Sequence, residues 1–407
     1  MKFRRFDPKK DLEACQRIWQ EVGWLNDDNS KGLDFFLNGN QSWVAEMDSI
    51  AECLVTNADG DLQYQDEKLS FSGVMGVTTS RVARKQGLAS RLTALAIAED
   101  AQRGALVSGL GMFEQGFYDQ LGYGSGGYEH IIDFDPGQLK INNKARPPQR
   151  LDKFHFQEIH NSRLNRIRNH GSVSFNNSSI MEAELGWGKK TFGLGYFNKD
   201  GELTHHLWAR PKDMEVGPYR ILWMSYRNSE GFLELMGLIK NFSEQVNLVS
   251  MVEPPGIQIQ DLLKNPLRSQ YKTWGGKFEQ KIRGIAFWQM RICDLIGTME
   301  KTHLRSEVTF NLELSDSIPK FLSKGQPWQG VAGEYVIKLG SPSSAERGID
   351  KSLPTLKASV NSFTRLWLGV QPASGLAVTD DLAGPNELLA QLDNAFCLPA
   401  PRMDWEF

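Results

Sequence analysis

A basic run that contains a glycine, VTTSRVARKQGLAS, occupies residues Val77–Ser90 between a β-rich segment and an expected helix. A helix N-terminus presents several backbone N–H donors in one direction, and its dipole favours negative charge. Gly87 lets the backbone come close to a ligand, while Arg81, Arg84 and Lys85 add the positive charge that suits phosphate. The run therefore indicates a site for a nucleotide pyrophosphate. A solvated basic loop before an ordinary helix is the alternative interpretation.

Further along the chain, the sequence FYDQLGYG occupies Phe117–Gly124 and contains two tyrosines, Tyr118 and Tyr123. A phenol has a reference pKa of about 10, so a tyrosine beside a leaving group can donate a proton to it. A core aromatic residue on a helix face is the alternative interpretation of Tyr118. The chain stops at Phe407, whose free carboxylate is a third group to consider.

Alternating strands and helices must position these groups. Strands are expected over Met1–Phe6, Trp43–Thr56, Lys68–Thr79, Ala105–Leu110 and Tyr128–Phe134, and helices over Leu12–Val22, around Asp34–Leu37, from Leu88 to about Gly104, and over Phe113–Leu121. The order β-α-α-β-β-β-α-β-α-β predicts an α/β or α+β sheet, with the basic run between a buried strand and a helix.

The rest of the chain divides at a polar, proline-containing linker over Asp135–Arg150. Beyond it, strand, helix and strand patterns at Ile221–Tyr226, Gly231–Phe242 and Val246–Val252 could repeat the first fold, without the basic glycine loop. From Cys293 the pattern changes to a smaller α+β module, with strands over Ser306–Leu314 and Gly333–Leu339, mixed structure over Leu353–Gly369 and a helix over Asn386–Phe396. We therefore expect three domains, over residues 1–150, 151–292 and 293–407.

Composition excludes several classes of protein. A chain of 407 residues with 40% hydrophobic content can form two or three packed cores, and its net charge of -3 gives no reason to expect nucleic-acid binding. No run approaches the roughly 20 apolar residues that span a bilayer, and the charged N-terminus does not resemble a secretory signal. The four cysteines are far apart and form no CxxC pair: Cys15, Cys53, Cys293 and Cys397. A reduced, cytoplasmic protein without a metal site is expected.

The motifs together resemble a known superfamily. Arg84–Ala89 (RKQGLA) matches the Q/R-x-x-G-x-G/A signature of the GCN5-related N-acetyltransferases (GNAT), and its combination with FYDQLGYG resembles the enhanced-intracellular-survival (Eis) family. The resemblance implies an α+β fold of tandem GNAT domains with mixed, splayed sheets, the second of them degenerate. A sterol-carrier-like α+β domain would follow them. It also implies a homo-oligomer, a hexamer in the relatives.

The resemblance further implies where acetyl-CoA would lie. Backbone groups at the end of a splayed strand would pair with the pantetheine arm, the loop and first helical turn would surround the pyrophosphate, and two residues after the next strand would flank the thioester. In that order, the residues are Val77, Thr78 and Thr79; Lys85, Gln86, Gly87, Leu88, Ala89 and Ser90; and Phe113 and Glu114. Lys85 and Gln86 stand where many relatives carry arginines.

Two catalytic roles follow from the same resemblance. Tyr118, and not Tyr123, would protonate the thiolate of CoA, while the carboxylate of Phe407 would accept a proton from the attacking amine, directly or through water. Glu114, Asp404 and Glu406 are alternative acceptors. The expected activity is direct acetyl transfer to a primary amine, either aminoglycoside-like or lysine-type. A non-catalytic protein that binds CoA or a lipid through the C-terminal domain is the alternative.

Overall fold

The computed structural model describes residues 1–25, 31–142 and 145–406, in two compact units. The first contains Met1–Gly127, Asn169–Asn177 and the chain from Ala286 onward, and the second contains Tyr128–Arg168 and Ser178–Ile285. Units defined by packing need not coincide with sequence domains, so the division into 1–150, 151–292 and 293–407 stays a prediction.

The first unit is built around an eight-stranded sheet of order β1-β2-β3-β4-β5-β15-β6, with β9 paired to β3. Its strands are β1 (Lys2–Arg5), β2 (Gln41–Met47), β3 (Ile50–Tyr64), β4 (Glu67–Thr79), β5 (Val107–Gly111), β6 (Gly124–Ser125), β9 (Val173–Phe175) and β15 (Trp288–Ile292). Trp43–Thr56, expected as one β-rich run, forms parts of β2 and β3. A two-residue turn at Asp48 and Ser49 separates them, and both residues have positive φ as such hairpin turns require.

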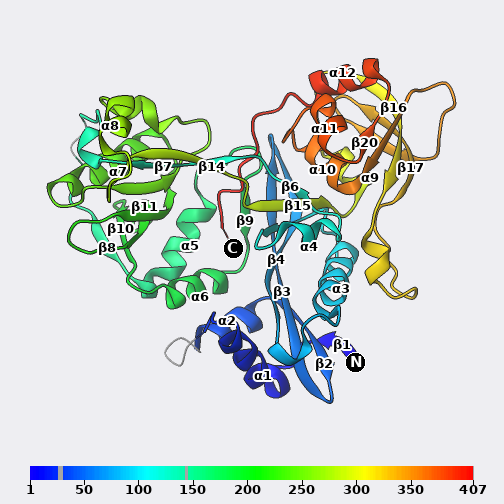
Figure 1. Ribbon diagram of the computed structural model, residues 1–407, viewed down its shortest axis with the longest axis horizontal. Helices are drawn as coiled ribbons and strands as arrows, with labels where there is room; N and C mark the ends of the chain where they lie inside the picture. The colour runs from blue at the N-terminus through cyan, green and yellow to red at the C-terminus, as the bar shows by residue number, and fades with distance from the viewer. Residues whose placement is uncertain (26–30, 143–144, 407) are drawn as a thin grey trace. The chain divides into compact units, whose positions relative to one another are not determined.

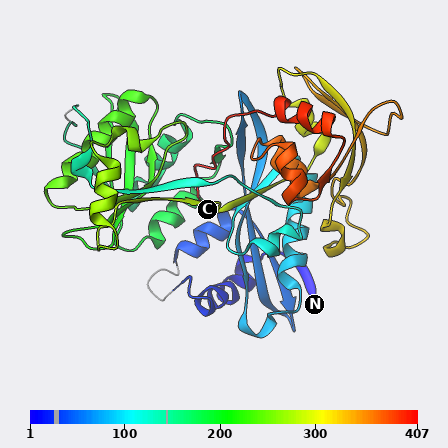
Figure 2. The ribbon, with the colours of Figure 1, turned by 45° about the horizontal axis from the view of Figure 1, so that its top comes forward.

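The helices of this sheet are α1 (Pro8–Glu21), α2 (Lys31–Gly39), η1 (Arg81–Ala83), α3 (Leu88–Gln102) and α4 (Gln115–Asp119). Figure 1 shows α3 on one side of β3 and β4, with α1 and α2 on the other, and Figure 2 shows α3 along the same strands. The spacing of Leu88, Leu92, Leu95 and Ala96 predicts one apolar face of α3. Leu88, Leu92 and Ala96 are buried in the core, and the half-buried Leu95 packs against it.

One predicted strand joins a different sheet. Tyr128–Phe134 was expected as the last strand of the first domain, and it forms as β7 (Glu129–Phe134). However, β7 pairs with β13 and β14 in the second unit, while β15 takes the place between β5 and β6. The expected pairing is wrong because an apolar alternation specifies a strand and its buried face but not its partner.

The second unit contains a seven-stranded sheet of order β14-β7-β13-β12-β11-β10-β8. Its further strands are β8 (Gln149–Leu151), β10 (Phe192–Phe197), β11 (Leu203–Pro211), β12 (Tyr219–Ser225), β13 (Val249–Val252) and β14 (Lys281–Ile285). Its helices are η2 (Pro136–Gln138), η3 (Lys153–His155), α5 (Phe156–Leu164), α6 (Ser179–Trp187), α7 (Ser229–Asn241), η4 (Phe242–Glu244), η5 (Ile259–Leu262) and α8 (Pro266–Thr273).

The two large sheets share one topology. Each begins with four antiparallel strands (β1 to β4 and β8-β10-β11-β12), continues with a parallel pair (β4-β5 and β12-β13), and ends with two antiparallel additions. A helix connects each parallel pair, α3 in the first sheet and α7 in the second. The second-to-last strand of each sheet lies far in sequence from its neighbours. In the first sheet it is β15, which follows the elements of the second sheet, and in the second sheet it is β7, which precedes them. The shared order supports a duplicated fold.

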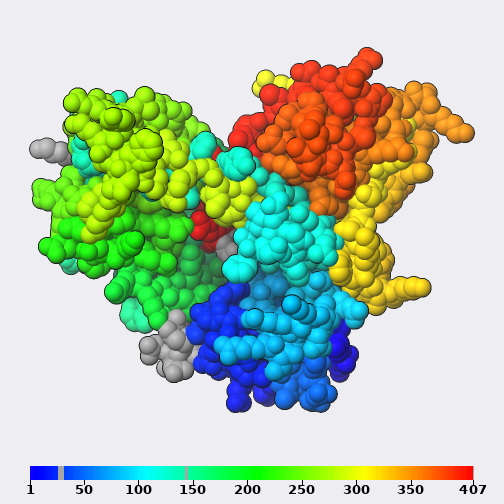
Figure 3. Space-filling view, viewed as in Figure 1, coloured from blue at the N-terminus to red at the C-terminus, as the bar shows by residue number. Residues whose placement is uncertain are grey.

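A five-stranded sheet of order β18-β17-β16-β19-β20 forms a C-terminal module within the first unit. Its elements are α9 (Leu295–Glu300), β16 (Val308–Ser315), η6 (Ile318–Phe321), β17 (Gly333–Leu339), β18 (Ser344–Arg347), β19 (Thr355–Ser359), α10 (Val360–Trp367), α11 (Ala373–Thr379), β20 (Leu382–Ala383) and α12 (Asn386–Ala395). Figure 3 shows the yellow segment that includes η6 beside the cyan surface that includes α3, and these two elements are in contact.

The predicted α+β class with mixed sheets is confirmed. All four cysteines are free. Within the described residues, no helix is both long and apolar enough to cross a membrane.

Candidate active site

The strands β4 and β5 separate where the site begins. Their parallel pairing ends at Val74 and Leu110, whereas β4 continues to pair with β3 as far as Thr79. A register shift in the β3–β4 pairing accompanies this separation, and Gly76 at the bulge has a φ of 59°. The side of β4 that faces away from β3 therefore loses its strand partner over residues 75–79. This is the edge that the sequence predicts for the pantetheine arm, and it includes Val77, Thr78 and Thr79.

The loop after β4 has the backbone form expected of an anion-binding turn. Lys85 and Gly87 both have positive φ, 60° and 73° respectively. Such residues orient successive N–H groups into a concave nest that favours anions. A Cβ atom at Gly87 would meet no heavy atom within 4 Å, so the backbone conformation, and not crowding, explains this glycine.

The N-cap position of α3 offers no side chain to the N–H groups of the first turn. Gly87 is the N-cap residue and makes no side-chain hydrogen bond to the helix. By contrast, Asn228 caps the equivalent helix α7 of the second sheet and accepts a hydrogen bond from the N–H of Gly231 at 2.9 Å. The N-terminus of α3 is therefore open to an outside acceptor, whereas the side chain of Asn228 covers the N-terminus of α7.

Exposed side chains give this loop its charge. Arg84, Lys85 and Gln86 are exposed, and neither Arg84 nor Lys85 forms an ion pair with another described residue. Arg81 is held in place differently, because its backbone N–H and its guanidinium both donate to Glu21. Leu88 is buried and fixes the start of α3, with Ala89 and Ser90 half-buried after it.

Tyr118 lies on the short helix α4 and is 8% exposed. It belongs to the hydrophobic cluster that also contains Leu88, and the half-buried Val77 and Ala89 pack against the same cluster. The fold thus brings the predicted tyrosine together with the end of β4 and the start of α3. Its hydroxyl makes no hydrogen bond to any other residue that the structure describes, so it is available to a ligand.

Burial controls the ionisation of this tyrosine. Burial raises the pKa of Tyr118 to about 12, and the negative charge of Glu114 adds to the effect. The phenol is therefore protonated at neutral pH. Glu114 is the N-cap of α4, where its carboxylate accepts a hydrogen bond from the N–H of Phe117 at 2.9 Å. Phe113, beside it, is 89% exposed and lies outside the cluster.

Tyr123 has a different environment. It is fully buried, and its hydroxyl shares a 2.8 Å hydrogen bond with the Ser108 hydroxyl. Burial raises its pKa as well. The hydroxyl of Tyr123 thus has a partner in the core, whereas that of Tyr118 has no hydrogen-bond partner among the described residues.

Phe407, the expected source of a terminal carboxylate, lies outside the described residues. The preceding segment packs onto the first unit. Trp405 is 0% exposed and meets the ring of Phe175 edge-on at 5.6 Å, while the N–H of Arg402 donates to the carbonyl of His170 at 3.0 Å. The alternative acceptors Asp404 and Glu406 flank Trp405.

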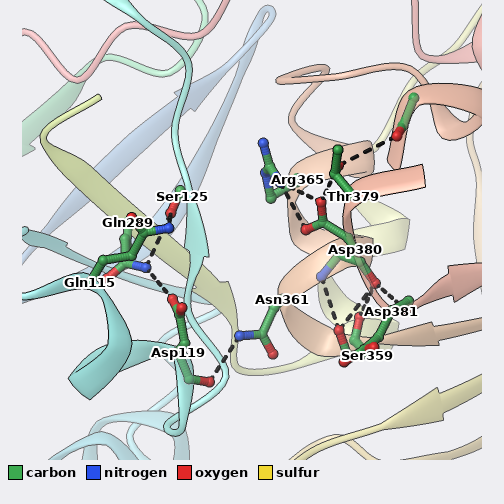
Figure 4. Close-up of polar contacts among 12 residues, drawn as sticks. Gln115, Asp119, Ser125, Gln289, Ser359, Asn361, Arg365, Thr379, Asp380 and Asp381 are labelled. Atoms are coloured by element: carbon green, nitrogen blue, oxygen red, sulfur yellow. Dashed lines mark hydrogen bonds and ion pairs between the residues drawn. The ribbon is translucent and has the colours of Figure 1, made fainter. Parts of the chain in front are cut away.

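A polar group beside Tyr118 was missed by the sequence analysis. The Gln289 amide on β15 donates to the Asp119 carboxylate at 2.6 Å and to the Ser125 hydroxyl at 3.3 Å (Figure 4). The Gln115 amide donates to the same hydroxyl at 3.1 Å. Burial raises the pKa of Asp119, an effect that the hydrogen bond from Gln289 opposes. Only the exchange of β15 into this sheet reveals the group, and no local motif signals it.

Comparisons with known proteins agree with this geometry. Residues 9–126 match the family model described as an acetyltransferase (GNAT) domain. A search among curated proteins found no match. Several solved structures are similar over the whole chain, and three of them illustrate the likeness.

A conserved protein of unknown function from Enterococcus faecalis V583 aligns with 18% identity and a TM-score of 0.79, covering 100% of this chain and 99% of that one. A GCN5-related N-acetyltransferase from Anabaena variabilis ATCC 29413 aligns with 15% identity and a TM-score of 0.78, covering 100% of both chains. Eis1 from Mycobacterium abscessus aligns with 12% identity and a TM-score of 0.78, again covering 100% of both.

At these identities the likeness establishes the fold, whereas the matched domain provides the link to chemistry. The open start of α3, the separated strands and the buried tyrosine lie within that domain or at its edge. The domain and the neighbours together support an N-acetyltransferase, and a GNAT domain uses an acyl-CoA as its donor.

Proposed function

We propose that this chain is an Eis-type N-acetyltransferase that moves the acetyl group of acetyl-CoA directly to a primary amine. The observation that supports this proposal most strongly is the junction of β4 and α3. There, a strand edge without a partner strand among the described residues leads into a helix N-terminus without a side-chain cap. Tyr118 lies in the hydrophobic cluster against which that junction packs. The aminoglycoside-like and lysine-type acceptors are both amines of this class.

In this proposal the chain holds acetyl-CoA mainly through its backbone. Val77, Thr78 and Thr79 offer the strand edge to the pantetheine arm, and residues 85–90 surround the pyrophosphate with N–H donors. Arg84 and Lys85 supply charge that no described acidic partner neutralises. Lysine and glutamine at positions 85 and 86 leave backbone donation intact. Phe113 and Glu114 lie after β5, where they would flank the thioester.

Tyr118 acts as the general acid. When the amine displaces CoA, the sulfur leaves as a thiolate, which has a reference pKa of about 8.5 in water. Burial raises the pKa of a thiol as it raises that of a phenol, so a buried thiolate accepts a proton more readily than one in water. A tyrosine with a pKa of about 12 is protonated when needed and can donate over one hydrogen bond.

The carboxylate of Phe407 is proposed as the general base. A free α-carboxylate has a pKa of about 3.5 and needs burial or a water relay to accept a proton from an ammonium group. The burial of Trp405 two residues earlier supports a docked end. Extending the chain by two glycines beyond Phe407 should abolish most turnover while acetyl-CoA still binds. Full activity of the extended protein would remove Phe407 from the mechanism.

The C-terminal module is proposed to be sterol-carrier-like in architecture, and the second large sheet to be a degenerate GNAT fold. Phe310, Phe363 and Trp367 of the module are 0% exposed, and the Trp367 ring stacks on Tyr64 of β3 at 4.4 Å. A homo-oligomer, a hexamer by resemblance to the relatives, completes the proposal.

The test is acetyl-CoA-dependent release of free thiol in the presence of polyamines, aminoglycosides and lysine peptides, with calorimetric titration of acetyl-CoA and of CoA. We expect micromolar binding of both and thiol release with at least one amine. Absence of binding and of thiol release would favour the non-catalytic alternative. Binding without release would instead locate the error in the choice of acceptors.

A further inference from the structure

The short helix that carries Tyr118 needs contacts from other elements to be stable. Helix α4 has only five residues, and a helix of this length is not stable by itself in water. Its N-terminus is capped from within by Glu114. At the other end, the carbonyl of Tyr118 accepts the N–H groups of Leu121 and Tyr123, at 2.9 and 3.3 Å. The carbonyl of Asp119 accepts the N–H of Gly122 at 3.1 Å, and further donors to this end of the helix come from elsewhere.

Those donors come from distant parts of the sequence. The Asn361 amide donates to the carbonyl of Asp119 at 2.9 Å (Figure 4). The same amide donates to the carbonyl of Tyr123, also at 2.9 Å. The Ser317 hydroxyl donates to the carbonyl of Gln120 at 2.7 Å. The guanidinium of Arg291 donates to the carbonyl of Leu121. These bonds join residues separated by 170 to 242 positions. Three side chains outside the matched domain therefore supply the C-terminal cap of α4.

The loop after α4 is also pressed closely against this cap. A Cβ atom at Gly122 would lie 2.7 Å from both Val360 and Arg291, and one at Gly124 would lie 2.4 Å from the carbonyl oxygen of Asn361. Only glycine allows so close an approach of the two segments. The backbone between Leu121 and Gly124 has no room to move toward α10.

The donors themselves are rigidly held. Asn361 lies in the first turn of α10, whose N-cap Ser359 accepts a hydrogen bond from the N–H of Ser362. Arg365 on the same helix forms two bonds to the carboxylate of Asp380, at 2.8 and 2.6 Å. Arg291 is paired with Asp316 at 2.7 Å, and both side chains are 0% exposed.

We propose that Asn361, Ser317 and Arg291 are positioning residues that hold α4 and thereby aim the Tyr118 hydroxyl at the leaving sulfur. This inference rests on the proposed acid role of Tyr118. It makes the C-terminal module part of the catalytic apparatus, because Ser317 and Asn361 donate hydrogen bonds to the end of α4. Displacements of about 1 Å at a reacting group can cost up to about 100-fold in rate, so small shifts of α4 are measurable.

The decisive variant is Asn361→Asp, which keeps the shape of the side chain and removes both N–H donors. Asn311→Asp is the matched control, because the Asn311 amide also donates to two carbonyls, those of Asp350 and Leu353 at 2.8 and 3.1 Å, within the C-terminal module and away from α4. We expect Asn361→Asp to lower kcat about tenfold or more with KM for acetyl-CoA within about twofold. Asn311→Asp should lower the unfolding temperature with kcat within about twofold. Ser317→Ala, which removes one hydroxyl, should lower kcat about threefold and serves if the first variant does not fold.

Two further readouts separate this inference from the proposed function. Amide hydrogen exchange at Leu121 and Tyr123 should speed up in Asn361→Asp and not in Asn311→Asp. In a Tyr118→Phe background, Asn361→Asp should cost little additional turnover. Unchanged kcat and unchanged exchange in both Asn361→Asp and Ser317→Ala would overturn the positioning role. A fully active Tyr118→Phe protein would instead overturn the proposed acid, whatever the exchange result.

Discussion

Replacement of Gly87 by alanine tests the phosphate loop most specifically. Gly87 has a φ of 73°, in a region where an L-residue costs about 1–2 kcal/mol. A Cβ atom there would touch nothing within 4 Å, so the variant adds no steric clash. Because the loop is exposed, it can relax to a negative φ in the free protein. Acetyl-CoA must then restore the strained form, and its Kd should rise about 5- to 30-fold.

Gly104 provides the matched control at the other end of α3. Its φ is 97°, and a Cβ atom there would also meet nothing within 4 Å. Gly104→Ala should therefore carry a similar backbone penalty, visible as a lower unfolding temperature, while Kd for acetyl-CoA stays within about twofold. Calorimetric titration of both variants with acetyl-CoA measures the difference. An unchanged Kd in Gly87→Ala would refute the assignment of residues 85–90 to the pyrophosphate.

Three other predictions follow from charges and ionisation. Replacing Arg84 and Lys85 together by alanine should weaken acetyl-CoA binding several-fold at low salt. The difference should shrink at 0.5 M salt, where the Debye length is about 4 Å, because exposed charges are screened. A salt-independent loss of affinity would contradict a charge role. Burial raises the pKa of Tyr118 to about 12, so at any pH below about 11 deprotonation of this tyrosine should not lower kcat. A fall in kcat centred near pH 10, absent in Tyr118→Phe, would instead show a tyrosine with an unperturbed pKa. Arg291→Met leaves the carboxylate of Asp316 buried without its ion-pair partner and should lower the free energy of unfolding by about 3–5 kcal/mol, measured by denaturant titration. The control Lys357→Met breaks an exposed ion pair with Glu313 and should leave the denaturation midpoint almost unchanged.

Local sequence patterns predicted the elements of the fold well. The β-like run of small and β-branched residues over Lys68–Thr79 and the helical spacing from Leu88 to Gly104 correspond to β4 and α3, because both patterns belong to a single element. The signature over Arg84–Ala89 predicted the junction between them for the same reason, since a strand, a turn with positive φ and a helix start are all local features.

Long-range pairing was not predictable in this way. The strand over Tyr128–Phe134 was expected in the first sheet, yet β15 holds that place and brings Gln289 to the carboxylate of Asp119. Asn361 caps α4 across 242 positions of the sequence, and a lone asparagine at the start of a helix carries no mark of that partner. Such contacts depend on which elements become neighbours in the fold. The neighbours of an element cannot be identified from a short segment of a single sequence.

The general-acid role of Tyr118 is tested by the steady-state turnover of Tyr118→Phe with the best amine found, together with calorimetric titration of the same variant with acetyl-CoA. Tyr123→Phe is the control, because its hydroxyl bonds to Ser108 in the core and has no proposed role in proton transfer. We expect Tyr118→Phe to lose about 100-fold or more in kcat with an unchanged Kd, and Tyr123→Phe to lose stability with kcat within about threefold. Wild-type turnover in Tyr118→Phe would contradict the general-acid role.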